Sequence, residues 1–337
     1  TKFISTFGNI NMYASYLSIS IPVLLAVFAF CKNWFSRILS GILLIAAGCN
    51  ILIANSDSVF LGIFAGVVVV TILAFMQGRL RYSSFAVFLL FVGNLVLGFI
   101  NKYGHTRYDK KRGGLAIALN RLDIAFVLCG AALLVFAVVC VCNWKLGTRV
   151  AAWNKKKIVL IVCGACVALG VIGIIVLAVT GSSLLTFNDK WGSYRGYIWR
   201  KIVEVYGDAP FVNKLFGYGN ESVRVTLKAA CYNEMVQVTG KVYDNAHNEL
   251  LQYLFTTGIV GLLSYLALVG SSIVYMFKHA KEHAWISVCL AATVGYFAQS
   301  ILNLNQPITT PLFFVFMAMG VGTVNYCRRV KELEKRA

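Results

Sequence analysis

Long apolar runs separated by short polar segments make up most of this chain. Runs of about 17 to 23 residues recur, and each is long enough to cross the hydrocarbon core of a bilayer as an α-helix. Nine runs are predicted to be transmembrane helices: residues 11–30, 38–54, 59–77, 84–100, 122–142, 158–180, 254–277, 284–303 and 311–327. The pattern therefore predicts an all-α polytopic membrane protein.

One long polar interval divides these runs into two groups. Residues 181–247 have mixed composition and separate the sixth run from the seventh. We therefore expect three parts: an N-terminal bundle of about six spans at 1–180, a large external loop with interfacial helices at 181–247, and a C-terminal bundle of about three spans with a tail at 248–337. The chain opens on Thr1 rather than Met, so we expect further residues upstream.

Composition and charge support this interpretation and orient the spans. The chain is 59% hydrophobic and 13% charged, with a mean hydropathy of +0.74, which excludes an ordinary soluble protein. Cytoplasmic loops of membrane proteins carry an excess of Lys and Arg. Counting spans back from the basic tail at 328–331 puts the other basic segments on the same side: Lys278 and Lys281, residues 145–157, Arg79 and Arg81, Lys32 and Arg37. We place that side in the cytoplasm and the interval 181–247 outside.

A predicted external loop, residues 101–121, breaks this charge rule because it carries six basic residues against the single acid Asp109. Basic residues on the outer side suggest attraction to an anionic ligand or to anionic headgroups. A charge bias that a short loop tolerates without any ligand is the alternative.

The middle of the polar interval predicts an amphipathic helix at 193–203. Its apolar side carries Tyr194, Ile198, Ile202 and Val205. Arg195 and Trp199 lie one turn apart on a neighbouring face. The composition is typical of a helix at a membrane surface, with its arginines directed to phosphate groups. Residues 208–210 predict the end of this helix, and residues 216–220 predict a turn.

The polar interval closes with Tyr243-Asp244-Asn245-Ala246-His247-Asn248-Glu249-Leu250-Leu251. Asp244 and Asn245 are residue types that cap helices, and leucines follow at helical spacing, so His247 is predicted in the first turn of a helix. There the helix dipole disfavours the imidazolium, and free amides can hold an anion. A neutral histidine beside an anion can accept a proton. An ordinary interfacial histidine is the alternative.

Five stretches occur in a characteristic order between residue 6 and about residue 263: Thr6-Phe7-Gly8-Asn9-Ile10-Asn11, Arg195-x-x-Ile198-Trp199, Leu215-Phe216-Gly217-Tyr218-Gly219, Ala246-His247-Asn248-x-x-Leu251 and Gly258-x-x-Gly261-Leu262. In this order the chain resembles the O-antigen ligase and polymerase superfamily of bacterial membrane glycosyltransferases, with a glycosyltransferase C-type fold. Family members often carry Ser-Arg-Gly at the external end of an early span. Here the corresponding stretch is Asn55-Ser56-Asp57-Ser58, with an acid in place of the arginine.

The resemblance implies an enzyme that moves a glycan from an undecaprenyl diphosphate carrier to an acceptor hydroxyl, at the outer face of the bacterial cytoplasmic membrane. The acceptor is a glycan, a lipid or a protein, and ligase and polymerase activities both remain open. Such a reaction needs a cationic cradle for the departing diphosphate and a base for the hydroxyl. Arginine suits the cradle because its guanidinium binds phosphate oxygens bidentately.

The candidate base is His247, and the candidate cradle residues are Arg195 first, then Arg200 and Arg121. Asn248 and Asp244 are candidates for orienting the ring or the sugar. Each of these residues also has a purely structural interpretation. Arg195 is then an interfacial arginine that extends toward the headgroups, Arg121 the positive flank of a span, and Asp244 a helix cap.

No cofactor, metal or nucleic acid is expected. The external segments lack paired carboxylates at a spacing typical of divalent metals, and Gly217-x-Gly219 lacks the strand and helix that a phosphate loop needs. Cys163-x-x-Cys166 has metal-like spacing but stands within a span without His or acidic partners.

Two rival functions are a transporter or flippase of lipid-linked saccharides, and a sensor or scaffold. A transporter should carry ionisable residues within its spans or an internal repeat. We find neither feature in the sequence, which favours an enzyme.

Overall fold

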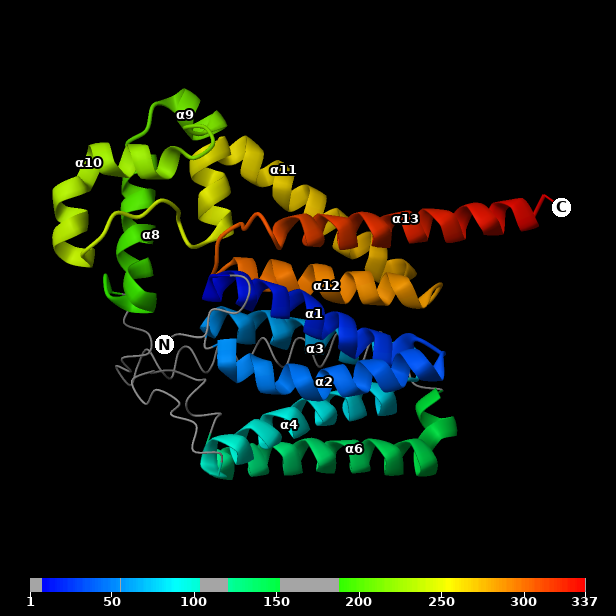
Figure 1. Cartoon of the computed structure of the whole chain (residues 1–337). Helices are drawn as coiled ribbons and strands as arrows, with labels where there is room; N and C mark the ends of the chain where they lie inside the picture. Colours follow the sequence, from blue (N-terminus) through cyan, green and yellow to red (C-terminus); the bar gives the residue numbers. More distant parts are fainter. Residues whose placement is uncertain (1–7, 55, 104–120, 152–187, 337) are drawn as a thin grey trace. The chain divides into compact units, whose positions relative to one another are not determined.

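The computed structural model describes residues 8–54, 56–103, 121–151 and 188–336, and within these ranges the regular elements are all helices (Figure 1). Their bounds are α1 Ile10–Phe30, α2 Trp34–Ala54, α3 Asp57–Met76, α4 Leu80–Tyr103, α6 Leu122–Ala151, α8 Trp191–Gly207, α9 Phe211–Phe216, α10 Ser222–Thr239, α11 Glu249–His279, α12 Ala284–Ser300 and α13 Thr310–Glu334. The chain divides into two compact units. The first comprises 1–155, 271–299 and 305–337, and the second 156–270 and 300–304.

Seven of the described helices are long and apolar enough to cross a membrane, namely α1, α2, α3, α4, α6, α11 and α13. A further apolar helix, α12, is shorter, at 17 residues. The predicted all-α polytopic membrane protein is thereby confirmed. The predicted span at 158–180, with its Cys163-x-x-Cys166 pair, lies outside the described residues, as does most of the loop 101–121. The total of nine spans and the three-part division at 180 and 247 stay predictions.

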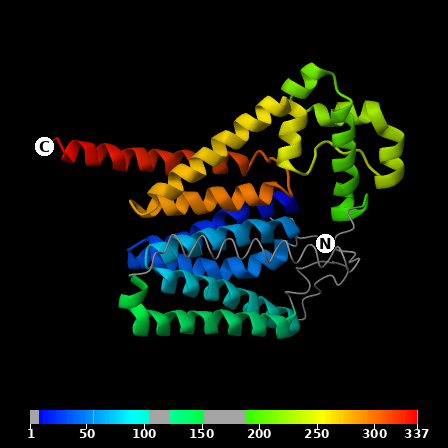
Figure 2. The ribbon, with the colours of Figure 1, turned by 180° about the vertical axis from the view of Figure 1, so that it is seen from behind.

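The first unit is a helix bundle with α1 at its centre. Helix α1 packs against α2, α3 and α4, and α6 packs against the outer side of α4 (Figures 1 and 2). Buried side chains such as Leu17, Ile21 and Leu25 make α1 part of the core. By contrast, α6 exposes large apolar side chains, among them Leu134 and Val135. An exposed apolar face of this kind suits contact with lipid chains.

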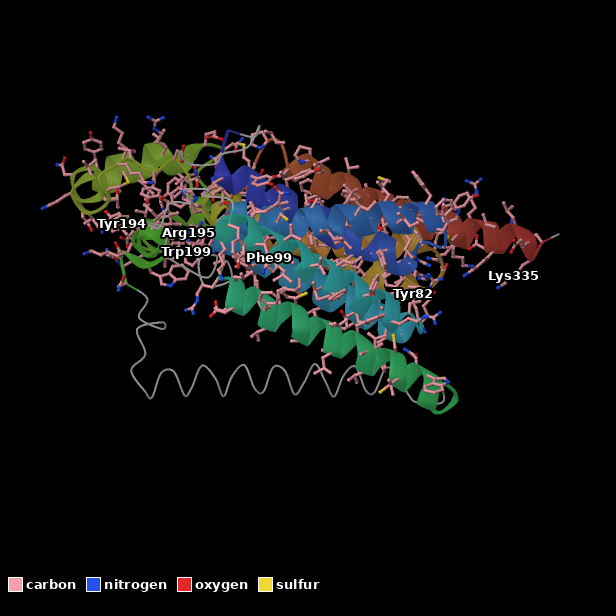
Figure 3. All side chains as sticks on the ribbon, turned by 60° about the horizontal axis from the view of Figure 1, so that its bottom comes forward. Tyr82, Phe99, Tyr194, Arg195, Trp199 and Lys335 are labelled. Atoms are coloured by element: carbon pink, nitrogen blue, oxygen red, sulfur yellow. The ribbon has the colours of Figure 1, made fainter. Side chains whose placement is uncertain are left out.

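The predicted cytoplasmic ends of the helices lie together in the first unit. Tyr82, at the start of α4, and Lys335, at the end of α13, are at one end of the bundle, and Phe99 is toward the other (Figure 3). The Gln77 side-chain nitrogen donates to the Ala280 carbonyl over 3.2 Å, which joins the α3–α4 turn to the α11–α12 turn. The described basic residues at the α3–α4 turn, the α11–α12 turn and the end of α13 therefore share one end, as expected for a positive cytoplasmic side.

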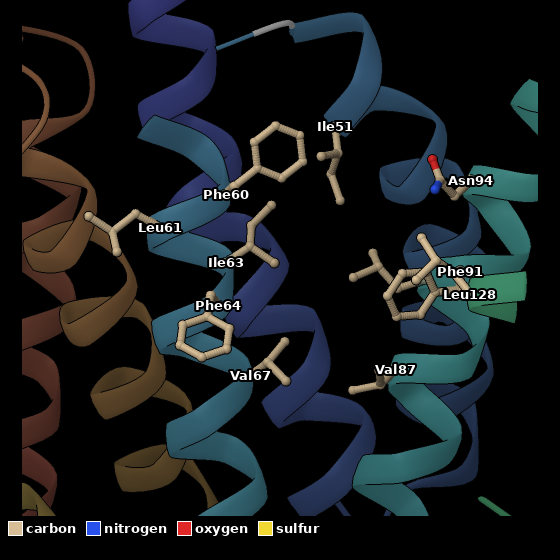
Figure 4. A pocket seen from close by; sticks show the side chains of 11 residues that line it. Ile51, Phe60, Leu61, Ile63, Phe64, Val67, Val87, Phe91, Asn94 and Leu128 are labelled. Atoms are coloured by element: carbon tan, nitrogen blue, oxygen red, sulfur yellow. The ribbon is translucent and has the colours of Figure 1, made fainter. Parts of the chain in front are cut away.

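The bundle contains an apolar cavity of about 550 Å³ between α3 and α4 (Figure 4). Phe60, Ile63 and Phe64 of α3 line one wall, and Phe91 of α4 lines the opposite wall. Asn94 of α4 is the polar side chain in this lining, and it is buried. The two helices therefore leave a hydrophobic space between them.

Glycines allow the closest helix crossings in the first unit. A Cβ atom added to Gly93 of α4 would lie 1.9 Å from the Ile45 carbonyl oxygen of α2. A Cβ atom added to Gly48 of α2 would lie 2.1 Å from the Leu90 carbonyl oxygen. The backbones of α2 and α4 thus touch directly, as small residues permit between membrane helices.

We expect Gly93→Ala to lower the thermal stability of the purified protein in detergent, because the added methyl group collides with the α2 backbone. The expected cost is about 1–3 kcal/mol, typical of overpacking. The matched control is Gly130→Ala on α6, where an added Cβ meets no atom within 4 Å. Alanine there should leave the Tm unchanged or raise it, since alanine favours helix over glycine. An unchanged Tm for Gly93→Ala would contradict the close crossing.

Candidate functional site

The second unit has a small apolar core of its own. The core residues come from α8, α10, the segment before α11 and α11 itself: Tyr197, Ile198, Ile202, Val223, Leu227, Met235, Tyr243, Ala246 and Phe255. Tyr194 and Val205 pack against this core and are partly buried. The apolar side predicted for residues 193–203 therefore packs against protein. Contact of this helix with a membrane surface stays a prediction.

The first turn of α8 departs from regular helix, which corrects the predicted helical start at residue 193. Residues 192–194 all have left-handed φ values, between 57° and 72°. The regular helix begins after this turn and presents Arg195 and Trp199 one turn apart (Figure 3). Apolar side chains continue at helical spacing through Tyr194, so the sequence pattern hides the turn. The predicted helix end at 208–210 is confirmed, since α8 ends at Gly207.

Hydrogen bonds from both sides anchor the segment that carries His247. From α8, Trp199 Nε1 donates to the Ala246 carbonyl oxygen over 2.9 Å. The Tyr243 hydroxyl donates to the Ser193 carbonyl oxygen over 3.0 Å. From α11, Gln252 Oε1 accepts from the Ala246 amide at 2.9 Å. The arginine–tryptophan motif and the histidine motif are therefore in direct contact.

The histidine lies just before α11 rather than in its first turn. The capping residue is Asn248, whose Oδ1 accepts from the Leu251 amide at 3.0 Å, so the predicted caps Asp244 and Asn245 are wrong. Asn245 Oδ1 instead accepts from the His247 amide at 3.1 Å. His247 has a left-handed φ of 48°, which is uncommon for a residue other than glycine. Three cap-forming residues within five positions made this boundary ambiguous in the sequence.

The His247 imidazole is held neutral by its surroundings. The pKa of His247 is lowered to about 4, mainly by burial and also by the positive charges of Arg195 and Lys241, while Asp244 opposes them. The ring meets the Tyr243 ring edge-on, with centroids 5.8 Å apart. Within the described part of the chain, the buried Nδ1 atom has no hydrogen-bond partner. The neutral state agrees with the prediction, but burial and neighbouring cations replace the helix dipole as its cause.

Arg200 forms ion pairs with acidic side chains. It contacts both carboxylate oxygens of Asp189, at 3.1 and 2.9 Å, and Glu204 Oε1 at 2.8 Å. Glu234 lies 3.8 Å away and also pairs with Lys201. Arg200 therefore links Asp189, just before α8, to Glu204 in α8 and Glu234 in α10.

Arg121 belongs to the first unit, where it is exposed and pairs with Asp123 at 2.7 Å. The stretch that departs from the family pattern is in the same unit. Ser56 and Ser58 there are buried, and Gln299 of α12 donates from Nε2 to Ser58 Oγ over 3.3 Å. Ser58 thereby connects α3 to α12, whereas Arg195 and His247 are in the second unit.

Comparison with protein families matches residues 112–266 to the model described as O-antigen ligase. This match, over slightly less than half of the chain, supports the O-antigen ligase and polymerase superfamily. The resemblance seen in the sequence is confirmed, and four of its five stretches fall inside the match. The match supports a membrane glycan ligase or polymerase in general, and with the apolar spans it suggests the bacterial inner membrane. A search of the curated proteins finds no match.

The two glycine-containing stretches of the matched region, residues 215–219 and 258–262, contact each other. Gly258, with φ 67° and ψ −173°, interrupts α11 and removes the helical partners of two preceding carbonyls. The loop after α9 replaces those partners. The Tyr218 amide donates to the Phe255 carbonyl, and the Gly219 amide donates to the Thr256 carbonyl, each over 3.0 Å.

Glycine is required on both sides of this contact. A Cβ atom on Gly217 would lie 2.3 Å from the Thr256 carbonyl, and one on Gly258 would lie 2.2 Å from the Leu215 carbonyl oxygen. The sequence indicates a turn at 216–220, but not its partner, because the two motifs are about forty residues apart. Lys241, Tyr243 and Gln252 lie within six positions of His247 and were still missed, because only the folded chain shows which side chains face the ring or hold its segment.

We expect Gly258→Ala to disrupt the loop at 215–219, because alanine strongly disfavours this backbone conformation and its methyl group would collide with Leu215. Thermal stability and protease resistance of the 208–221 region should both fall. Gly207→Ala at the end of α8 is the matched control, because an added Cβ there meets no atom within 4 Å. A Gly258→Ala protein with normal Tm and protease resistance would refute the contact.

Proposed function

We propose that this O-antigen ligase domain transfers a glycan from an undecaprenyl diphosphate carrier to an acceptor hydroxyl, outside the cytoplasmic membrane. In this proposal His247 is the base and Arg195 is part of the diphosphate cradle. The observation that carries the proposal is the neutral His247 ring beside the Arg195 charge, on two family motifs joined by the Trp199–Ala246 hydrogen bond.

The base must accept the acceptor's proton as the acceptor oxygen bonds to the anomeric carbon of the donor sugar. The bond from that carbon to the phosphate oxygen breaks, and the diphosphate leaves with the electron pair. A pKa of about 4 makes His247 a weak base in the free protein. A bound diphosphate would offset the positive charges of Arg195 and Lys241, which depress this pKa, and would stabilise the imidazolium. Donor binding therefore strengthens the base.

Fewer arginines are candidates for the diphosphate cradle than the sequence suggested. Arg195 is half-buried at the first regular turn of α8, close enough to His247 for its charge to lower the histidine pKa. Lys241 is a further cation of the same site. Arg200 pairs with Asp189 and Glu204, so we assign it a structural role. Arg121 stays a candidate, and Asn248 and Asp244 act mainly through the local structure of the His247 segment.

We expect His247→Ala to lower glycan transfer about 10²–10⁴-fold, the usual contribution of a positioned base, without loss of folding. The assay uses purified protein in detergent with a lipid-linked donor and an acceptor. His283→Asn is the matched control, because it removes an exposed imidazole at the start of α12 and keeps a side chain able to cap that helix. Full transfer by His247→Ala would reject the base assignment.

Arg195→Ala should raise the KM for the donor more than the KM for the acceptor, because the guanidinium binds the diphosphate. Arg224→Ala removes an equal charge from the exposed side of α10 and should leave both constants unchanged. Unchanged donor dependence in Arg195→Ala would count against the cradle. A transporter or flippase would form no product in detergent, so product formation by the unmodified protein separates that alternative from an enzyme.

A further inference from the structure

A second cavity, of about 440 Å³, opens at the basic end of the first unit. Its lining residues come from α1, α2, α4 and α6: Phe28, Arg37, Arg81, Tyr82, Phe85, Phe136 and Cys140. The volume is within the range of ordinary ligand sites. The site is independent of the transferase proposal, because every lining residue belongs to the first unit.

The polar side of this cavity is formed by the guanidinium groups of Arg37 and Arg81, which both lie near the Tyr82 ring. The Arg37 guanidinium carbon is 4.3 Å from the centre of the Tyr82 ring, and that of Arg81 is 4.8 Å from it. Arg81 also donates to the Tyr82 hydroxyl over 3.0 Å. Among the described residues, neither arginine forms an ion pair with an acid. Two positive side chains that line one cavity without an acidic partner in the described part of the chain favour binding of an anion there.

The two arginines differ in their freedom to move. Arg37 Nη2 donates to the Cys31 carbonyl over 2.7 Å, and Nε donates to the Phe28 carbonyl over 3.2 Å, so the end of α1 fixes this side chain. Arg81 is exposed, and the contacts described for it are with Tyr82. One fixed and one adjustable guanidinium suit a phosphate group, because arginine binds phosphate oxygens through paired donors.

The opposite side of the cavity is aromatic. The Phe85 ring lies 5.8 Å from the Phe28 ring and 4.9 Å from the Phe136 ring, centre to centre. A free phosphate ion would leave this surface exposed to water, whereas a lipid chain would cover it. Trp34 at the start of α2 and Trp144 toward the end of α6 are strongly exposed. Exposed tryptophans are typical of the headgroup level of a membrane.

We propose that this cavity binds one anionic phospholipid, with its phosphate bound by Arg37 and Arg81 and the beginning of an acyl chain on Phe28, Phe85 and Phe136. Basic pockets between transmembrane helices on the cytoplasmic side bind headgroups of this class. The charge predicted for this end and the split between guanidinium and aromatic walls both favour such a lipid over a soluble anion.

The test is native mass spectrometry of the full chain in detergent with dioleoyl phosphatidylglycerol. Dioleoyl phosphatidylcholine and glycerol 3-phosphate serve as comparators. We expect retention of phosphatidylglycerol, and about tenfold weaker binding in Arg81→Gln, the usual scale of one lost charge-assisted contact. Arg81→Lys keeps the charge without the planar fork and should bind at an intermediate level. It also tests the site if Arg81→Gln fails to fold.

Arg329→Gln on α13 is the matched control, because Arg329 is exposed near the same end and does not line the cavity. It should bind phosphatidylglycerol as the unmodified protein does. Equal retention of phosphatidylcholine would show that the arginines do not select an anion. Equal binding of glycerol 3-phosphate would show that the aromatic wall is not used. An equal loss in Arg329→Gln would show a general charge effect. Each of these results overturns the proposal.

Discussion

The hydrogen bond from Trp199 to the Ala246 carbonyl is the contact on which the organisation of the site depends. It joins a helix that carries Arg195 to a short segment that carries His247, although these residues are about fifty positions apart in the chain. Without it, the segment that holds His247 in its left-handed conformation would lose one of its anchoring hydrogen bonds, and those of Gln252 and Tyr243 would remain. The ring would then regain access to water, and its pKa would return toward 6.5.

The second requirement for this unit is the contact between Gly258 and the loop around Gly217. The break at Gly258 lets α11 start beside the histidine segment and also bind the loop around Gly217. A continuous helix would use the Phe255 and Thr256 carbonyls internally and leave that loop without partners. The four stretches that resemble the family within residues 195–262 are thus two contacting pairs. Their shared order along the chain follows from the way they pack in space.

The apolar pattern predicts the membrane helices well, because a bilayer requires a long uninterrupted run that is visible in the sequence. Local chemistry likewise predicts the stop after α8 and the turn at Gly217. The sequence does not decide which residue caps α11, because Asp244, Asn245 and Asn248 can each cap a helix. It also fails for Arg200, because the acids that occupy this side chain include Asp189 and Glu234, which are eleven and thirty-four residues away.

The most direct measurement follows the charge of the His247 ring. The chain has four histidines, so replacing His105, His279 and His283 by glutamine leaves one imidazole for isotope-labelled NMR. The folded-state pKa lies below the ordinary value of about 6.5, so stability should fall as the pH drops from about 6.5 toward 4. The ring should stay neutral from pH 7 to pH 5 and titrate near pH 4. Titration near pH 6.5 would contradict a buried, neutral histidine beside Arg195.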